Sequence, residues 1–487
     1  MRFLLLFFAL GATLSAAPIR LHPDNPHYFE YKGKPLIIIT SAEHYGALIN
    51  LDFDYKQYLD TLHADGMNYT RLFMGAYVEN PDSFGIKFNT LAPLENRLIV
   101  PWKRSSTSGY IHGGNKFDLK QWDEAYFDRL KDFLKRAADR NIIVEITLFS
   151  SIYRDGYWEF SPFHPNNNIN DTQAEDRKKL QTLPVEGHNL LPYQEAYVRK
   201  LVHELNDFDN FFFEIQNEPW ADNEVLAMDL LPQNRTEKRK WTSYVHVASD
   251  ESLAWQRHLS HLIKNEEARL PKQHLIAQNF CNFKLPLTDV QQEISIINFH
   301  YAWPEAAYWN LGWDRVIGYD ESGFLGTEDA VYRKKAWHFL MAGGGLYNNL
   351  DYSFVPGHED GSFDNAGAEG GSPGGGSPSL RKQLKVLGDF LRGVDFTRMA
   401  PDQNLIAHAP GLFARGLAEP GKQYAVYFDG SGPADIRLNI PKGRYRIEWI
   451  NTRTGKTLRK ETVRSGDKGL TLTTPDFSED VALRITK

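Results

Sequence analysis

Short apolar segments alternate with amphipathic helical stretches from about residue 30 to residue 395. This alternation is typical of parallel β/α units, in which each buried strand is followed by a helix that covers it. Helical patterns lie at 122–140, 194–206, 252–269 and 327–341. The eight segments with strand character are 36–41, 67–74, 142–149, 211–216, 274–280, 294–300, 315–320 and 345–350. Eight units predict an α/β fold of the (β/α)₈ TIM barrel type, with its active site at the C-terminal ends of the strands.

A different pattern begins near residue 401, where short strands alternate apolar and polar residues. Turn residues such as Asp429-Gly430 and Thr454-Gly455 separate them. The expected strands are 412–417, 423–428, 434–440, 444–450, 470–473 and 481–485. This pattern predicts a small antiparallel β-sandwich. We therefore expect a catalytic barrel over residues 18–398 and a β-sandwich domain over 399–487, which caps the barrel or, alternatively, binds glycan.

The N-terminus has the order of a secretory signal. Met1-Arg2 precedes an apolar run at 3–10, and small residues continue to Ala17. We expect residues 1–17 to be a signal peptide and the mature chain to be secreted or periplasmic. The apolar run is too short to anchor the chain across a bilayer, and no later segment is long enough. Cys281 is the only cysteine, so an internal disulfide is excluded.

The net charge of the chain limits the kinds of molecule that it is expected to bind. The formal net charge is −7, and the chain has no long run of Lys or Arg. This composition argues against nucleic acid or an anionic membrane surface as the partner. Two long segments, 75–117 and 150–188, follow the second and third strands and are rich in aromatic, Asn and Gly residues. In a barrel they would wall the cleft. The Gly-, Ser- and Pro-rich segment 357–379 is either a long connection or a lid.

The strand at 211–216 runs into the most informative motif of the chain. Its apolar residues end abruptly in Asn217-Glu218-Pro219. A carboxyl group at the mouth of an apolar barrel resists ionisation, so it can donate a proton to a leaving oxygen. Glycoside hydrolysis needs a second carboxylate opposite the first, and in retaining enzymes the two stand about 5 Å apart.

Three features together resemble the clan A glycoside hydrolases, particularly the cellulase-like family 5. They are the Asn-Glu-Pro that ends the fourth strand, His300 on the sixth strand and Glu321 at the end of the seventh. The resemblance covers roughly residues 20–395. It implies that Glu218 is the acid/base and Glu321 the nucleophile of a retaining O-glycosidase that cleaves an oligo- or polysaccharide by double displacement.

The same resemblance implies contacts around the two acids. Arg71 would support the nucleophile, Asn217 would bind the sugar 2-hydroxyl, and His300 and Tyr301 would line the site. Arg71 has an alternative role as the partner of Glu214 in a buried ion pair. The sequence departs from the family in two places.

The first departure is that Tyr301 follows His300 directly, whereas the family usually has one residue between them. The second is Ser322, which follows Glu321 where the family often has an aromatic residue. The second departure leaves Asp320 or Glu328 as alternatives for the second carboxylate.

Other residues follow expected strand ends and could contact a sugar. Glu43, His44 and Tyr45 come after the first strand and are candidates for binding the terminal sugar. Indole rings can stack on the flat faces of sugars. The tryptophans considered as such platforms are Trp158, Trp220, Trp303 and Trp309.

Two rival functions remain to be weighed. A metal-dependent hydrolase would need clustered ligands, but no His-x-His follows the first strand and no Glu-x-x-His or Cys cluster has ligand spacing. We therefore expect no metal and no cofactor. The other rival is a secreted carbohydrate-binding protein without activity. The presence of both Glu218 and Glu321 argues against it, because a binder does not need two converging carboxylates.

Overall fold

The computed structural model describes residues 17–81, 83–184, 189–231, 241–365 and 374–487. Its larger part is a parallel eight-stranded barrel, as the sequence predicts. The strands lie side by side in the order β5, β8, β9, β12, β13, β14, β15 and β4. Their bounds are β4 (Ile38–Ala42), β5 (Tyr69–Phe73), β8 (Ile143–Ser150), β9 (Phe211–Asn217), β12 (Ile276–Asn282), β13 (Ile296–His300), β14 (Val316–Ser322) and β15 (Leu346–Leu350).

The seam between β4 and β5 is bridged mainly by one side chain. The amide oxygen of Asn68 accepts from the backbone N–H of Ile39 at 2.8 Å, and its amide nitrogen donates to the carbonyl of Ile37 at 2.9 Å. The strands are buried along their length, which is the pattern of parallel strands covered on both faces. The expected signal peptide, 1–17, lies outside the described residues except for its last residue.

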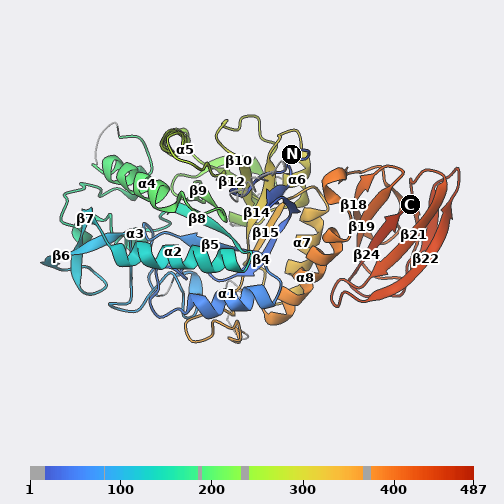
Figure 1. Cartoon of the computed structure of the whole chain (residues 1–487), viewed down its shortest axis with the longest axis horizontal. Coiled ribbons are helices and arrows are strands. Elements are labelled where there is room, and N and C mark those ends of the chain that lie inside the picture. Colours follow the sequence, from blue (N-terminus) through green and yellow to red (C-terminus); the bar gives the residue numbers. More distant parts are fainter. Residues whose placement is uncertain (1–16, 82, 185–188, 232–240, 366–373) are drawn as a thin grey trace, which may run out of the picture.

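Helices surround the barrel (Figure 1). The four helical stretches expected from the sequence are α2 (Glu124–Asp139), α4 (Leu191–Leu205), α5 (Asp250–Glu267) and α7 (Asp329–Leu340). The described residues contain four further helices that were not expected, α1 (Tyr55–Ala64), α3 (Asp155–Trp158), α6 (Pro304–Trp309) and α8 (Pro378–Arg392). Helix α2 illustrates why the sequence forms a helix at such a position. The Asp123 side chain caps the N-terminus of α2 by accepting from Ala125 N–H, and the apolar stripe of the helix is buried.

The bottom of the barrel is closed by a short N-terminal sheet. Its strands are β1 (Arg20–Leu21), β2 (Phe29–Tyr31) and β3 (Lys34–Leu36). The Phe29 ring stacks on Phe212, and Tyr69 stacks on the same ring, each at 6.2 Å between centroids. This apolar plug leaves the opposite, C-terminal end of the strands as the open mouth.

Long connections lie at that mouth. The segment after β5 contains the hairpin β6 (Trp102–Ser108) and β7 (Asn115–Trp122), and the segment after β8 contains α3 (Asp155–Trp158). A further hairpin after β9, β10 (Val225–Asp229) and β11 (Tyr244–Val247), pairs with β12. Short 3₁₀ turns lie at Ser83–Gly85, Pro165–Asn167, Arg177–Lys179, Trp241–Ser243 and Phe396–Arg398. Of the Gly-rich segment 357–379, residues 366–373 lie outside the described part.

The C-terminal part consists of two antiparallel sheets, as expected. All six predicted strands are present, and β22 was missed because its side chains are mostly exposed and charged, as is common on an edge strand. One sheet contains β16 (Ala400–Pro401), β18 (Phe413–Glu419), β19 (Gln423–Asp429), β24 (Asp480–Thr486), β21 (Gly443–Ile450) and β22 (Thr457–Ser465); the other contains β17 (Ile406–His408), β20 (Asp435–Leu438) and β23 (Leu470–Thr473).

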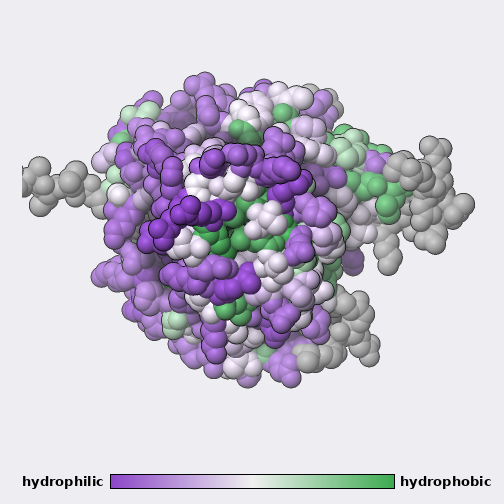
Figure 2. Space-filling model, turned by 90° about the vertical axis from the view of Figure 1, so that its right-hand side faces the viewer, coloured by the Kyte–Doolittle hydropathy of each residue, from purple (hydrophilic) through white to green (hydrophobic). Residues whose placement is uncertain are grey.

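Helices α7 and α8 lie between the barrel and this domain (Figure 1). From α7, the buried Arg333 guanidinium bonds both oxygens of Asp480, at 3.0 and 2.8 Å, and Trp337 stacks on Tyr427 at 5.1 Å. Viewed from the end that carries the C-terminal domain, hydrophilic side chains cover most of the surface and hydrophobic ones gather near the centre of the view (Figure 2). In the described part of the chain, every helix is too short or too polar to cross a membrane.

Candidate active site

Glu218 follows the last residue of β9 and turns its carboxyl group into the barrel mouth. Its backbone has φ 45°, a left-handed conformation that a non-glycine residue adopts only when its surroundings hold it there. Asn279 accepts from the Glu218 N–H at 3.0 Å, and the Ser151 hydroxyl donates to the Glu218 carbonyl at 2.6 Å. The Tyr153 hydroxyl donates to the Glu218 carboxylate at 2.8 Å. These bonds fix the direction of the side chain.

Glu321 lies near the end of β14 and is surrounded by donors. The Tyr301 hydroxyl bonds one carboxylate oxygen at 2.6 Å, and the Tyr45 hydroxyl bonds the other at 3.0 Å. Arg71 approaches the second oxygen at 3.4 Å. Burial raises the pKa of Glu321, but the charge and hydrogen bond of His300, the charge of Arg71 and the Tyr301 hydroxyl outweigh it and hold that pKa well below its usual range. These groups thus favour the ionised form of the Glu321 carboxylate.

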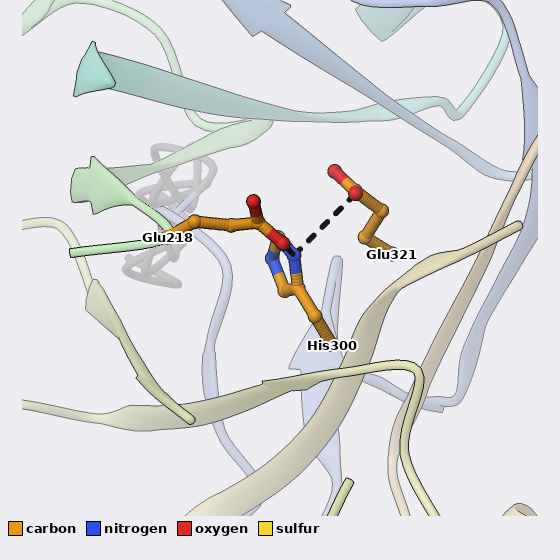
Figure 3. A group of neighbouring side chains, drawn as sticks. All are labelled: Glu218, His300 and Glu321. Carbon is orange, nitrogen blue, oxygen red and sulfur yellow. Dashed lines mark hydrogen bonds and ion pairs between the residues drawn. The ribbon is translucent and has the colours of Figure 1, made fainter. Parts of the chain in front are cut away.

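His300 stands between the two acids (Figure 3). Its Nδ1 lies 2.9 Å from Glu218 Oε1 and 3.5 Å from Glu321 Oε1. Burial lowers the pKa of His300, but the charges of Glu321 and Asp320 together raise it well above its usual value. One carboxylate oxygen of Glu218 and one of Glu321 lie within 4.8 Å of each other. This close spacing is typical of a retaining pair, whereas inverting pairs stand roughly 6.5–9.5 Å apart.

The alternative second carboxylates lie elsewhere. Asp320 is fully buried inside the barrel, where one of its oxygens accepts from Asn279 at 2.9 Å and from Asn298 at 3.0 Å. An irregularity in the pairing of β14 with β15 falls between Tyr319 and Ser322. Such an irregularity breaks the alternation of side chains between the two faces of a strand. Asp320 and Glu321 can therefore both face inward although they are adjacent in sequence. Glu328 is exposed and precedes α7.

Arg71 forms the floor of the site. Its guanidinium is fully buried and bonds Glu214 at 2.9 and 2.5 Å, and it also donates to the Asn217 amide oxygen at 2.8 Å. The same group reaches Glu321, so the ion pair with Glu214 and the contact to the predicted nucleophile occur together. Burial raises the pKa of Glu145 beside it, and the charges of Glu214 and Asp320 add to that rise.

The structure brings most, but not all, of the expected residues together. Tyr301 reaches the site because its backbone is left-handed, with φ 51°. Trp220 is buried with its ring edge-on to His300 at 5.4 Å, behind the pocket. Trp303 packs under the Lys284 ammonium at 4.2 Å and does not line the pocket. Glu43 is fully buried and accepts from Gly46 N–H, Ala47 N–H and the Thr90 hydroxyl, so it holds a loop rather than facing the pocket.

A small pocket joins these side chains. Sequence reasoning found six of its residues, His44 and Tyr45 among them, and missed Tyr153 and Glu79, which lie on loops after β8 and β5. The position of these loop residues just after strand ends was the one signal available. The pocket is lined by His44, Tyr45, Phe73, Tyr77, Glu79, Phe84, Tyr153, Asn217, Glu218, Tyr301, Glu321, Phe324 and Leu350. The long segments after β5 and β8 therefore contribute walls, as expected.

Two groups of side chains have the spacing of metal ligands. They are Glu218, His300 and Glu321 at the pocket, and Glu145, Glu214 and Asp320 in the barrel core. The core group already surrounds the Arg71 guanidinium, which supplies positive charge where a cation would bind. At the pocket, the charges of Glu321 and Asp320 raise the pKa of His300, so a metal would have to displace a proton from the ring in order to bind there.

The larger part of the chain is thus a (β/α)₈ barrel with two carboxylates, those of Glu218 and Glu321, at the C-terminal ends of its strands. The chain is similar to a candidate glycoside hydrolase from Bacteroides vulgatus ATCC 8482, with 13% identity, a TM-score of 0.63, and coverage of 98% of this chain and 83% of that one. It is also similar to a family 5 glycoside hydrolase from the same organism, with 14% identity, a TM-score of 0.61, and coverage of 96% and 93%.

A third solved structure, described as a glycoside hydrolase, is 14% identical with a TM-score of 0.56 and coverage of 97% of each chain. The comparisons with protein-family models and with curated proteins give no match. At such low identities the likeness to solved structures shows the fold alone. What the site does is argued from its own residues.

Proposed function

We propose that the protein is a retaining glycoside hydrolase that cleaves O-glycosidic bonds of carbohydrate. The observation that carries the proposal is the approach of Glu218 and Glu321 to within 4.8 Å across one pocket, with their roles separated by their surroundings. Glu321 is held ionised by His300 and Arg71, while Glu218 makes no contact with Arg71. One carboxylate can thus attack while the other transfers a proton.

Two steps follow from this division. In the first, a Glu321 oxygen attacks the anomeric carbon and forms a glycosyl ester, while Glu218 gives its proton to the oxygen of the departing group as the glycosidic bond breaks. In the second, Glu218 takes a proton from water, and the water oxygen attacks the anomeric carbon and displaces Glu321 as a carboxylate. The two displacements retain the anomeric configuration.

Neighbouring side chains support each step. Tyr301 and Tyr45 orient the two Glu321 oxygens, and Tyr153 orients Glu218 while also accepting from the Asn217 amide at 2.8 Å. Asn217 lines the pocket beside both acids, where it can contact the hydroxyl next to the anomeric carbon. Such contacts strengthen as positive charge develops on the sugar ring.

Trapping the covalent intermediate tests the assignment. A 2-fluoro glycoside with a dinitrophenyl leaving group should inactivate the enzyme, and peptide mapping should place the sugar on Glu321. The variant Glu321→Gln should take up no label, and Asp320→Asn, one residue away, should still be labelled. A label on another residue, or a product of inverted configuration, would overturn the proposal.

The rival function, a carbohydrate-binding protein without activity, makes a different prediction for one variant. Glu218→Ala in a binder would keep the affinity for its glycan, and the wild type would show no turnover. In a hydrolase, Glu218→Ala should lose turnover of sugar-linked substrates while it keeps some turnover of glycosides whose leaving group needs no proton. A screen of aryl glycosides and of plant, algal and host polysaccharides identifies the sugar.

Export from the cytoplasm, to the periplasm or the medium, is part of the proposal and rests on the N-terminal sequence.

A further inference from the structure

One polar wall of the pocket is formed by His44 and Glu79 and takes no part in the two-acid mechanism. His44 follows β4, and Glu79 lies on the loop after β5. In the ring of strands, β4 is separated from β14 by β15, and β5 is separated from β9 by β8. This wall therefore faces the pocket from a side of its own, away from both the strand of Glu218 and the strand of Glu321.

Glu79 is held by three donors. His44 approaches its carboxylate at 3.2 Å, the Tyr77 hydroxyl donates at 3.1 Å, and the Asn89 amide donates at 2.5 Å. Only 3% of Glu79 is exposed. These three donors use most of the roughly four lone pairs of a carboxylate and hold it in place. Because Glu79 lines the pocket, its remaining acceptor capacity can serve a sugar hydroxyl without movement of the side chain.

Two further polar atoms at this wall lack partners among the described residues. They are Nδ1 of His44 and the hydroxyl of Tyr352, a residue that is 3% exposed. Their rings lie 5.9 Å apart. Burial raises the pKa of the Tyr352 hydroxyl, and the charges of Glu321 and Glu79 both add to that rise, although Tyr352 itself lies outside the pocket lining. Buried polar atoms without partners are uncommon and call for an explanation, and a polar ligand provides one.

Aromatic side chains from three loops also line the pocket. Phe84, from the loop after β5, contacts Phe324, from the loop after β14, at 6.5 Å. It also contacts Tyr153, from the loop after β8, at 5.2 Å. Cleavage inside a long polysaccharide requires a groove that is open at both ends. Loops that meet over the pocket and a polar wall at its side instead favour a substrate that enters by its end.

We propose that His44 and Glu79 bind the hydroxyls of the non-reducing terminal sugar, so that the enzyme removes one neutral sugar at a time from the chain end. This inference rests on the proposed function and specifies its substrate class. The sugar is neutral because a uronic acid carboxylate would meet the Glu79 carboxylate in a buried site, and like charges repel strongly there.

The first experiment follows the products. Oligosaccharides fluorescently labelled at the reducing end, built from the sugar found in a screen of 4-nitrophenyl glycosides, are digested and sampled over time. The expected result is a ladder that shortens by one sugar per step, with free monosaccharide as the first product. Early release of internal fragments, or preferred turnover of glycuronides over neutral glycosides, would overturn the inference. Trapping of Glu321 by the fluoro sugar would still succeed in that case, so the two failures can be distinguished.

The second experiment links the wall to individual hydroxyls. Glu79→Gln should lower kcat/KM about 10- to 100-fold, because a site built to bind a hydroxyl loses much when one partner is weakened. Monodeoxy aryl glycosides that lack one hydroxyl of the terminal sugar should cost the wild type a similar factor but cost Glu79→Gln little, which is the signature of a direct contact. The control Glu124→Gln changes an exposed acid on α2 and should leave kcat/KM unchanged.

A structural role for Glu79 would give another outcome. In that case the losses from Glu79→Gln and from each deoxy substrate would simply multiply, and the variant would also melt earlier than the wild type. His44→Gln provides an independent check, since it should show the same non-additive pattern with a deoxy substrate. Additive behaviour of both variants with every deoxy substrate would refute the contact.

Discussion

The hydrogen bond from Tyr301 to Glu321 provides the sharpest test of the nucleophile, because Tyr301→Phe removes one hydroxyl and little else. The bond is 2.6 Å long and ends on a buried carboxylate. Hydrogen bonds to charged groups contribute about 1.5–3 kcal/mol. The hydroxyl stabilises the carboxylate that departs from the sugar in the second step, so its loss should slow deglycosylation by roughly 10- to 150-fold.

The same change should move the pH dependence. In the wild type the pKa of Glu321 lies well below its usual range, so the nucleophile stays ionised even in mildly acidic solution. Without the Tyr301 hydroxyl, which helps to lower it, that pKa should rise. The acid limb of the profile of kcat/KM against pH should therefore move to higher pH, because Glu321 must be ionised to attack.

Pre-steady-state kinetics with a dinitrophenyl glycoside measure the first effect. Slow deglycosylation should produce a burst of phenolate equal to the enzyme concentration, followed by a slow steady rate. Tyr45→Phe, whose bond to the other oxygen is 3.0 Å, should behave similarly but more weakly. Tyr319→Phe is the control, since its hydroxyl bonds Ser322 instead. Absence of a burst together with an unmoved acid limb in Tyr301→Phe would refute the role given to Glu321.

Three other predictions concern the rest of the chain. Arg333→Met leaves the buried Asp480 carboxylate unpaired and should lower the free energy of unfolding by about 3–5 kcal/mol in urea titrations; a loss below about 1 kcal/mol would contradict this. Burial raises the pKa of Glu43 to about 7 in the folded chain, so the folded state binds the extra proton. This contribution to stability should be complete below about pH 4.5 and be lost as pH rises to about 7, by at most about 3 kcal/mol. The measurement is the difference in the free energy of unfolding between wild type and Glu43→Gln. A difference that does not change over this pH range would contradict the prediction. Because Arg71 and His300 already supply positive charge, dialysis against EDTA should leave turnover unchanged, and loss of turnover restored by a divalent metal would contradict that expectation.

The barrel was predictable from the sequence because its strands are short segments rich in apolar residues that alternate with helical patterns. All eight expected segments are strands, and the motif at Asn217-Glu218-Pro219 lies at the end of β9. The helices were harder to predict. Helix α6 has only six residues, too few for a clear period, and α1 was missed although Tyr58, Leu59 and Leu62 form a buried stripe. Between β12 and β13 the described chain has no helix, so the alternation breaks there.

The site was only partly predictable, because half of its walls lie on loops. Glu218 and Glu321 follow strands and could be found from strand ends. Glu79 and Tyr153 reach the pocket through loop conformations that no periodic pattern encodes. Glu43 shows the opposite case, since it follows β4 as expected but its side chain turns back to accept backbone N–H groups.

The backbone of the site explains why sequence spacing gives an incomplete picture of it. Tyr45, Glu218 and Tyr301 have φ of 61°, 45° and 51°, which lie in the left-handed region that glycine adopts without strain. Each such residue costs of order 1–3 kcal/mol. Each also places its side chain on a catalytic carboxylate or supplies one, which glycine could not do. The spacing of Tyr301 directly after His300, which departs from the family pattern, is accommodated by this turn of the backbone. The surrounding barrel outweighs the strain and keeps the carboxylates and their donors aligned.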